Sequence, residues 1–131
     1  MSGISKYTEM KIRLETRPMT AFDKHLVADI DRVILRRMTD SQISVDVVAT
    51  ELFMSPAKLR RLLQNATGFT PALYIMFVRM REAVQQLKMY PLHTIAFVAQ
   101  RCGFTDQAHF THAFSRFFGC SPLQYVQKLN Q

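Results

Sequence analysis

The chain has 131 residues, of which 48% are hydrophobic and 21% are charged, a composition typical of one globular domain with one apolar core. No apolar run approaches the ~18 residues of a membrane-spanning helix, and the N-terminal residues lack the apolar core of a signal peptide. The chain has only two cysteines, which excludes a disulfide-rich secreted domain. We therefore expect a cytoplasmic protein with no membrane partner.

Positive charge is distributed unevenly along the chain, which has a net charge of +7. Residues 1–52 carry eight Lys/Arg and eight Asp/Glu, whereas residues 53–131 carry nine Lys/Arg and only two acidic residues. The whole excess of positive charge thus lies in the second segment. It predicts a polyanionic partner, with nucleic acid as the first candidate. A basic surface that only keeps the protein soluble is the alternative.

The first 19 residues differ from the rest of the chain. Residues 10–16 alternate apolar and polar side chains, which is the period of a β-strand. No second convincing strand is present to pair with it, and a lone strand is not stable. We therefore predict an extended connector or tail over residues 1–19 and a folded domain over residues 20–131.

Helical periodicity dominates after residue 20 and predicts an all-α fold of about seven helices. Ser or Thr stands at most of the expected helix starts, three times followed by Pro, and Gly stands after three of the expected helix ends. The predicted helices cover residues 20–38, 45–53, 56–67, 71–89, 94–102, 106–118 and 122–128. The first should turn Phe22, Leu26, Ile30, Val33 and Ile34 inward. The fourth is the longest, at ~27 Å, and ends before Pro91.

Two parts of the chain match each other at an offset of 51 residues. The matching pairs are Leu59 and Phe110, Leu63 and Phe114, Gly68 and Gly119, Pro71 and Pro122, and Tyr74 and Tyr125. Each copy consists of a short helix, a tight turn and a second helix, the outline of a helix-turn-helix motif. We predict two such units, over about 20–69 and about 91–128, joined by a long connecting helix over about 70–89.

The second helix of each copy has a polar stripe opposite its apolar stripe. At ~100° per residue, the polar stripes consist of Lys58, Arg61 and Asn65 in the first copy and His109, His112 and Arg116 in the second. The two histidines therefore occupy positions that hold a Lys and an Arg in the first copy. Both helices are predicted to present a surface that can carry positive charge.

The same residues carry a family resemblance. The run Thr70-Pro-Ala-Leu-Tyr74, then Arg79, Arg81, Ala83, Leu87, Ile95-Ala, Gly103-Phe104, Phe110, Phe114, Gly119 and Ser-Pro-x-x-Tyr125 resembles the AraC/XylS transcription regulators. The resemblance covers about residues 22–128. It implies a seven-helix DNA-binding domain whose two recognition helices enter successive major-groove segments on one face of the DNA. Two recognition helices joined by a rigid helix would bind DNA as a dimer does whose half-sites lie ~34 Å apart.

The resemblance also implies site residues and partners. Carried over by position, the base-contacting residues are Ala57, Lys58, Arg60, Arg61 and Gln64 in the first unit and Gln107, Ala108, His109 and His112 in the second. Ser55, Asn65, Arg81 and Arg116 are expected to contact the DNA backbone, which positions the protein without specifying sequence. The expected partners are double-stranded DNA and RNA polymerase. No cofactor is implied, and oligomers are expected only through an upstream domain.

Several positions depart from the family pattern. Phe53 stands in the first turn where Gly or Asn is usual, and a positive φ would be costly for Phe, so we expect that turn to be shifted. In the second unit, Ala108, His112, Ser115 and Val126 replace a common Ser, a common Arg, a common Lys or Arg and a terminal Arg. The second unit is therefore expected to bind DNA more weakly, with stronger dependence on salt or with the assistance of a partner.

The segment RLETRPMTAFDKHL resembles the connector that precedes this domain in hybrid two-component regulators. This favours a detached C-terminal output domain, with a stand-alone small activator as the alternative. The Phe-rich stripes leave open a helical protein-interaction module that does not bind DNA. We interpret these aromatic residues as core instead, because most share one helical phase: Phe97, Phe104, Phe110, Phe114, Phe117 and Phe118.

Two cysteines and two histidines between Cys102 and Cys120 suggest a zinc site at first sight. Structural zinc sites generally use Cys pairs two to four residues apart, a spacing that is not present here. His109 and His112 also fall on the polar stripe, opposite the phenylalanines. No phosphate loop, paired-carboxylate motif or H-E-x-x-H sequence is present. We therefore predict neither a metal site nor an enzyme, and we interpret Asp106 as a helix-start residue.

Overall fold

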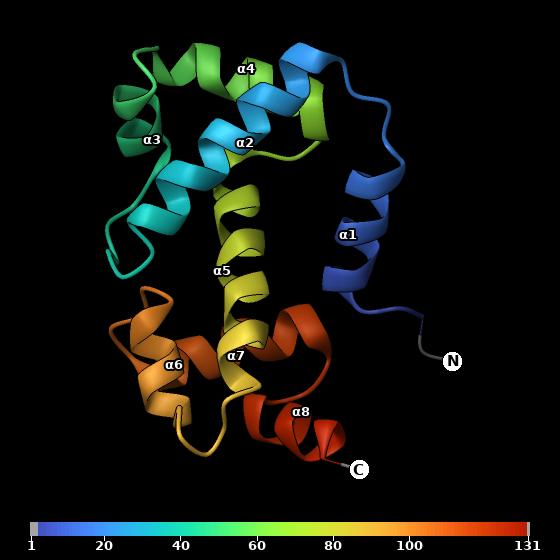
Figure 1. Ribbon diagram of the computed structural model, residues 1–131, viewed down its shortest axis with the longest axis vertical. Helices are drawn as coiled ribbons and strands as arrows, with labels where there is room; N and C mark the ends of the chain where they lie inside the picture. The colour runs from blue at the N-terminus through green and yellow to red at the C-terminus, as the bar shows by residue number, and fades with distance from the viewer. Residues whose placement is uncertain (1–2, 131) are drawn as a thin grey trace.

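The computed structural model describes residues 3–130, which form eight α-helices and no strand. The helices are α1 (Lys6–Thr16), α2 (Ala21–Arg36), α3 (Val45–Glu51), α4 (Pro56–Thr67), α5 (Pro71–Leu87), α6 (Ile95–Arg101), α7 (Gln107–Phe118) and α8 (Pro122–Leu129). Figure 1 shows α5 as a central strut, with α2, α3 and α4 around its upper end and α6, α7 and α8 around its lower end. The predicted all-α fold with two helical units and a connecting helix is confirmed.

Local sequence signals explain where the helices begin and end. Every helix has a Ser, Thr or Asp at its N-cap, whose side-chain oxygen accepts a hydrogen bond from a backbone N–H of the first turn. The predicted capping box at Thr20 and Asp23 is present at the start of α2. Gly68 and Gly119 end α4 and α7 in the left-handed conformation, as the repeat predicts.

Residues 6–16 form a helix, so the prediction of an extended segment there was wrong. The hydroxyl of Ser5 caps α1 by accepting a hydrogen bond from the backbone N–H of Thr8. Tyr7, Met10 and Leu14 then share one face and pack on the core, with Met10 only 3% exposed. The alternation along residues 10–16 therefore gave the wrong secondary structure. A strand would have turned Ile12 inward together with Met10, but Ile12 is exposed.

The apolar core runs through both units along α5, whose Tyr74, Phe77, Val78 and Met80 are almost completely buried. Phe104, Phe110, Phe114 and Phe117 are buried as predicted, and Phe118 is half-buried against the same core. Two aromatic predictions were wrong. Phe22 and Phe97 are exposed. Each lies in the first turn of its helix, which extends beyond the core.

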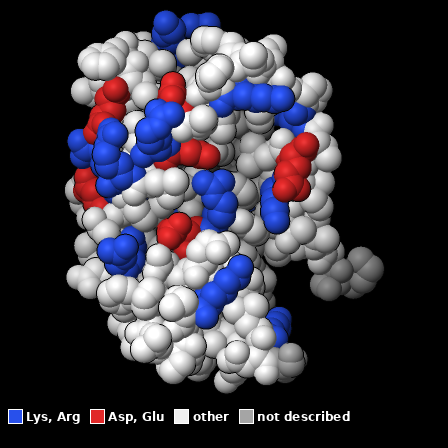
Figure 2. Space-filling view, viewed as in Figure 1, with Lys and Arg blue, Asp and Glu red and all other residues white. Residues whose placement is uncertain are grey.

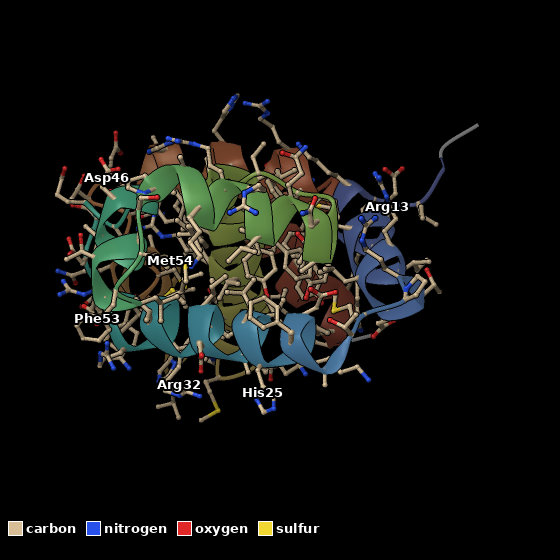
Figure 3. All side chains as sticks on the ribbon, turned by 90° about the horizontal axis from the view of Figure 1, so that it is seen from above. Arg13, His25, Arg32, Asp46, Phe53 and Met54 are labelled. Atoms are coloured by element: carbon tan, nitrogen blue, oxygen red, sulfur yellow. The ribbon has the colours of Figure 1, made fainter. Side chains whose placement is uncertain are left out.

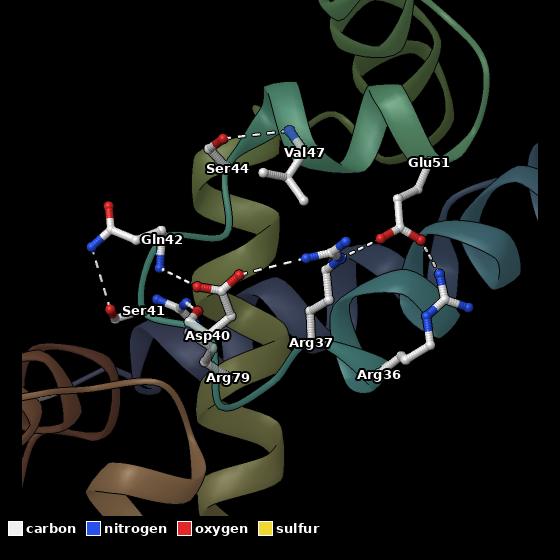
Figure 4. Close-up of polar contacts among 9 residues, drawn as sticks. All are labelled: Arg36, Arg37, Asp40, Ser41, Gln42, Ser44, Val47, Glu51 and Arg79. Atoms are coloured by element: carbon white, nitrogen blue, oxygen red, sulfur yellow. Dashed lines mark hydrogen bonds and ion pairs between the residues drawn. The ribbon is translucent and has the colours of Figure 1, made fainter.

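A polar network fixes the loop between α2 and α3 (Figure 4). Arg36 and Arg37, at the end of α2, both donate to the carboxylate of Glu51 at the end of α3. Arg37 also pairs with Asp40 at 3.6 Å, and Arg79 of α5 donates from Nη2 to the Asp40 carbonyl oxygen at 2.9 Å. The loop is thereby held to the middle of the strut.

No helix within residues 3–130 is both long enough and apolar enough to cross a membrane.

Candidate nucleic-acid interface

The two helix-turn-helix turns have the same backbone hydrogen bonds. In the first, the N–H of Met54 donates to the Ala49 carbonyl at 3.0 Å; in the second, Phe104 donates to Ala99 at 2.9 Å. The helix before each turn has seven residues, α3 in one unit and α6 in the other. The second turn has one more residue before its cap, Asp106. The structure thus confirms the internal repeat as a repeat of backbone geometry.

Phe53 occupies the position that Gly103 occupies in the second turn. Its φ is +58°, and that of Gly103 is +86°. The prediction that Phe53 shifts the first turn was therefore wrong. Phe53 accepts the left-handed conformation instead, at a cost of ~1–2 kcal/mol. Its side chain is 96% exposed and gains no burial in return.

The structure separates α4 into the two faces predicted from sequence. Leu59, Leu63 and Ala66 are buried against the core. The predicted contact residues are all exposed on this helix and at its cap: Ser55, Ala57, Lys58, Arg60, Arg61, Gln64 and Asn65. The Ser55 hydroxyl accepts a hydrogen bond from the backbone N–H of Lys58 at 3.1 Å, so it fixes the start of the helix. The side chains of α4 that face solvent carry three positive charges and no negative charge.

On α7 the phenylalanines are buried and the predicted contact residues Gln107, Ala108, His109, His112 and Arg116 are exposed. Asp106 caps this helix by accepting a hydrogen bond from the N–H of Ala108 at 2.9 Å, as expected of a helix-start residue. His109 packs edge-on against Phe104, with ring centroids 5.2 Å apart. His112 is free of such a contact and lines a shallow hollow with Gln107, Ala108, Thr111 and Ser115.

The charges of the protein separate by face. Seen from above, α2 and α4 pack side by side and lie along opposite edges of the view, with Arg32 and His25 on the outer side of α2 (Figure 3). Figure 2 views the α2 side, where carboxylates are interleaved with Lys and Arg over the upper half of the molecule and over α1. Neither α4 nor α7 contains an acidic residue. The exposed face of α4 therefore attracts anions without an internal counter-charge, whereas α7 carries one fixed positive charge, Arg116, and begins after the carboxylate of Asp106.

Arg81 was predicted to contact the DNA backbone, but the structure places it apart from the other predicted DNA contacts. It lies on α5, and its Nη2 pairs with a carboxylate oxygen of Asp31 on α2 at 3.5 Å. The other Asp31 oxygen accepts a hydrogen bond from the Tyr74 hydroxyl at 2.5 Å. Burial, followed by the nearby Asp31 carboxylate, raises the pKa of Tyr74 well above its ordinary value. Arg81 thus joins α5 to α2 and does not lie on the exposed faces of α4 and α7.

Two further side chains lie on the exposed side of α7 although the sequence argument did not select them as contacts. Thr111 and Ser115 line the hollow beside His112. At the repeat offset they match Arg60 and Gln64, both of which were selected on α4. Applying the offset to every α4 position would therefore have found them.

The cysteines and histidines that suggested zinc point in different directions. Cys102 is completely buried and Cys120 is half-buried, and both are free thiols. His109 and His112 are exposed on α7. No group of three or more His, Cys, Asp or Glu side chains within residues 3–130 is arranged to hold a metal ion.

Comparison with known proteins assigns this geometry to a family. A profile described as a helix-turn-helix domain matches residues 48–128. The porin thermoregulatory protein EnvY of Escherichia coli K12 is 37% identical over 86 residues, which cover 65% of this chain and 33% of EnvY. The transcriptional activator RhaS of Escherichia coli is 35% identical over 86 residues, 66% of this chain and 31% of RhaS. The chain spans less than half the length of the curated relatives it matches.

Solved structures agree with the sequence matches. An AraC-type regulator from Chromobacterium violaceum has the same fold, with a TM-score of 0.75 at 21% identity over 86% of this chain and 98% of that one. The DNA-binding domain of AdpA, in complex with target DNA, gives 0.69 at 26% identity, covering 77% and 89%. The C-terminal domain of AraT, a response regulator from Geobacillus stearothermophilus, gives 0.67 at 28% identity, covering 79% and 84%. The chain belongs to the AraC/XylS family of helix-turn-helix DNA-binding transcription regulators.

Proposed function

We propose that the protein binds double-stranded DNA sequence-specifically by placing α4 and α7 in successive major-groove segments, and that it thereby regulates bacterial transcription. The observation that carries this proposal is the repeated exposed, carboxylate-free face of the two helices, each following the same backbone turn. Two helices held on one strut suit two groove segments about one helical turn apart. The AdpA domain, whose structure is similar, is bound to target DNA.

The exposed side chains suggest a division of roles. Arg61 on α4 is suited to a bidentate contact with guanine, and Gln64 and Gln107 are suited to adenine. His112 is one of the polar side chains that line the hollow on α7 and would meet either a base edge or a phosphate. The remaining exposed side chains are Lys58 and Asn65 on α4 and Arg116 on α7. Arg116 lies near the end of α7 and is suited to phosphate.

The same relatives support a proposal about the place of this domain in a longer regulator. We propose that it is the C-terminal output domain of a two-component regulator, because the similar AraT domain is the C-terminal part of a response regulator. A stand-alone small activator is the second candidate. In either case RNA polymerase is the proposed protein partner, the cytoplasm is the proposed location, and oligomers would form through an upstream domain. Mass measurement of the full-length gene product separates the two candidates.

The proposal is tested by selecting binding sequences from random DNA duplexes. We expect enrichment of two boxes about one helical turn apart. On the selected duplex, Arg61→Ala should weaken binding by about 5- to 150-fold and relax base preference within one box, the effect of losing one bidentate base contact. Arg116→Ala should weaken binding to all sequences alike and reduce the salt dependence by about one phosphate contact.

The matched control is Lys24→Ala, which removes one positive charge from the exposed side of α2. Its neighbour His25 lies on the outer side of α2, away from α4 (Figure 3), so the control should change affinity little. The absence of any enriched sequence at low salt would refute sequence-specific binding. Equal losses in Lys24→Ala and Arg61→Ala would refute the assignment of α4 as a base-contacting helix.

A further inference from the structure

Helix α1 belongs to neither helix-turn-helix unit, yet it contacts both. Near its N-terminus, Tyr7 stacks on Phe77 of α5, with ring centroids 4.9 Å apart and planes inclined by 15°. The same ring lies 4.7 Å from that of Phe118, the last residue of α7. Lys6 lies over the neighbouring Phe117 ring at 5.1 Å. This end of α1 is thus fixed to the strut and to the end of the second recognition helix.

The other end of α1 contacts the end of the first recognition helix. Arg17, which follows α1, donates from Nη2 to the carbonyl oxygen of Asn65 in the last turn of α4, at 3.2 Å. The last carbonyl groups of a helix have no partner within it and carry its negative partial charge, so a guanidinium is favourable there. Arg13 also lies over the ring of Phe69, just after α4, at 5.5 Å.

These two contacts fall at matching places of the internal repeat. In Figure 1, α1 lies on the side of α5 where α4 and α7 both end. Phe118 and Gly119 in the second unit correspond to Thr67 and Gly68 in the first at the offset of 51. One helix therefore holds the C-terminal ends of both recognition helices.

Few other contacts hold the two units in a fixed relation. The helix pairs that pack extensively lie within one unit or include α5 or α1. On the side of α5 away from α1, the loop after α2 approaches the second turn at Met38 and Gly103. Bending of α5 is thus resisted by that loop on one side and by α1 on the other.

We infer that α1 is a brace that sets the relative orientation of α4 and α7, with Tyr7 and Arg17 as its positioning residues. The inference rests on the proposed function, because it concerns how the two helices meet DNA together. Once one helix is bound, the second meets its box at an effective concentration that depends on how well the linkage holds it at the required distance and angle. A fixed orientation raises this concentration for one spacing of the boxes and lowers it for others.

The experiment measures three affinities for each variant of the full chain. The duplexes carry both selected boxes, both boxes with two additional base pairs between them, and one box with the other scrambled. For Tyr7→Ala and Arg17→Ala we expect one-box affinity to stay unchanged. Affinity for the two-box duplex should fall about tenfold, and the preference for the selected spacing should shrink.

Three controls separate positioning from other effects. Tyr7→Phe keeps the stacked ring and should restore the wild-type preference for the selected spacing. Lys11→Ala removes one positive charge from an exposed position of α1 and should leave all three affinities unchanged. Circular dichroism establishes that each variant is helical at the assay temperature, and Arg17→Ala removes only one exposed hydrogen bond if Tyr7→Ala proves unstable.

The outcomes distinguish the two proposals. Equal losses of one-box and two-box affinity, or an unchanged spacing preference in folded Arg17→Ala, would overturn the role of α1 while leaving DNA binding intact. Failure of the unaltered protein to bind even the one-box duplex would overturn the proposed function, and the inference with it.

Discussion

Gly103 offers a test of how tightly the second unit packs against the first. It has a φ of +86°, and a Cβ at this position would lie 2.6 Å from the backbone carbonyl oxygen of Met38 and 3.0 Å from Nη2 of Arg79. Gly119 is a matched control, because its φ is +76° but a Cβ there would meet nothing within 4 Å. Replacing each glycine by Ala therefore imposes the same backbone strain, but only Gly103→Ala adds a steric conflict.

The magnitudes follow from these contacts. An alanine in the left-handed conformation costs ~1–2 kcal/mol, so Gly119→Ala should lower the free energy of unfolding by about that amount. At Gly103 the conflict is with backbone, which the Arg79 hydrogen bond to Asp40 holds in place. Overpacking of this kind adds ~1–3 kcal/mol, so Gly103→Ala should cost ~2–5 kcal/mol in total. This is a large part of the ~5–15 kcal/mol that stabilises a typical domain.

Urea unfolding followed by far-ultraviolet circular dichroism measures both variants. The midpoint should fall further for Gly103→Ala than for Gly119→Ala, with similar slopes. Equal losses of stability would refute the reasoning, because the contact of the second turn with Met38 would then contribute nothing beyond the shared strain.

Three further predictions concern single side chains. Burial raises the pKa of the Cys102 thiol to about 12, so iodoacetamide at mild alkaline pH should modify the half-buried Cys120 and spare Cys102 until urea unfolds the protein; equal labelling of both in the native state would contradict this. Hydrogen bonding from Arg37, assisted by Arg36, holds the pKa of Glu51 below its ordinary value. Its stabilising contribution is therefore present at neutral pH and is lost as the pH falls through that lowered pKa, so Glu51→Gln should reduce the thermal midpoint at pH 7 but make little difference in strong acid. A difference that persists in strong acid would indicate another cause. Phe53→Gly should raise the free energy of unfolding by up to ~1 kcal/mol in urea titrations, because it relieves the ~1–2 kcal/mol cost of a positive φ and loses no buried surface, while the larger backbone entropy that Gly loses on folding offsets ~0.5–1 kcal/mol; a destabilised variant would indicate a role for the exposed ring.

Much of the candidate site could be predicted because its signals are local or repeated. Ser55-Pro56 and Gly68 define the ends of α4, and the leucine spacing between them decides which of its side chains face solvent. The offset of 51 then transfers that face to α7. Arg81 could not be placed in this way. Its pairing with Asp31 depends on how α2 crosses α5, and the residue spacing within either helix does not predict how the two helices cross.

Sequence alone determined the helices from residue 20 onward, the two turns and the exposed faces of α4 and α7, since each depends on neighbours within about one turn of helix or on a repeated pattern. Only the tertiary structure decided the conformation of residues 6–16, because their apolar residues fit a strand as well as a helix until α5 and α7 provide a surface for Tyr7 and Met10. The tertiary structure likewise decided that Phe53 accepts a left-handed backbone. The packing of α3 and α4 on one core fixes that turn more strongly than a single residue's preference can shift it.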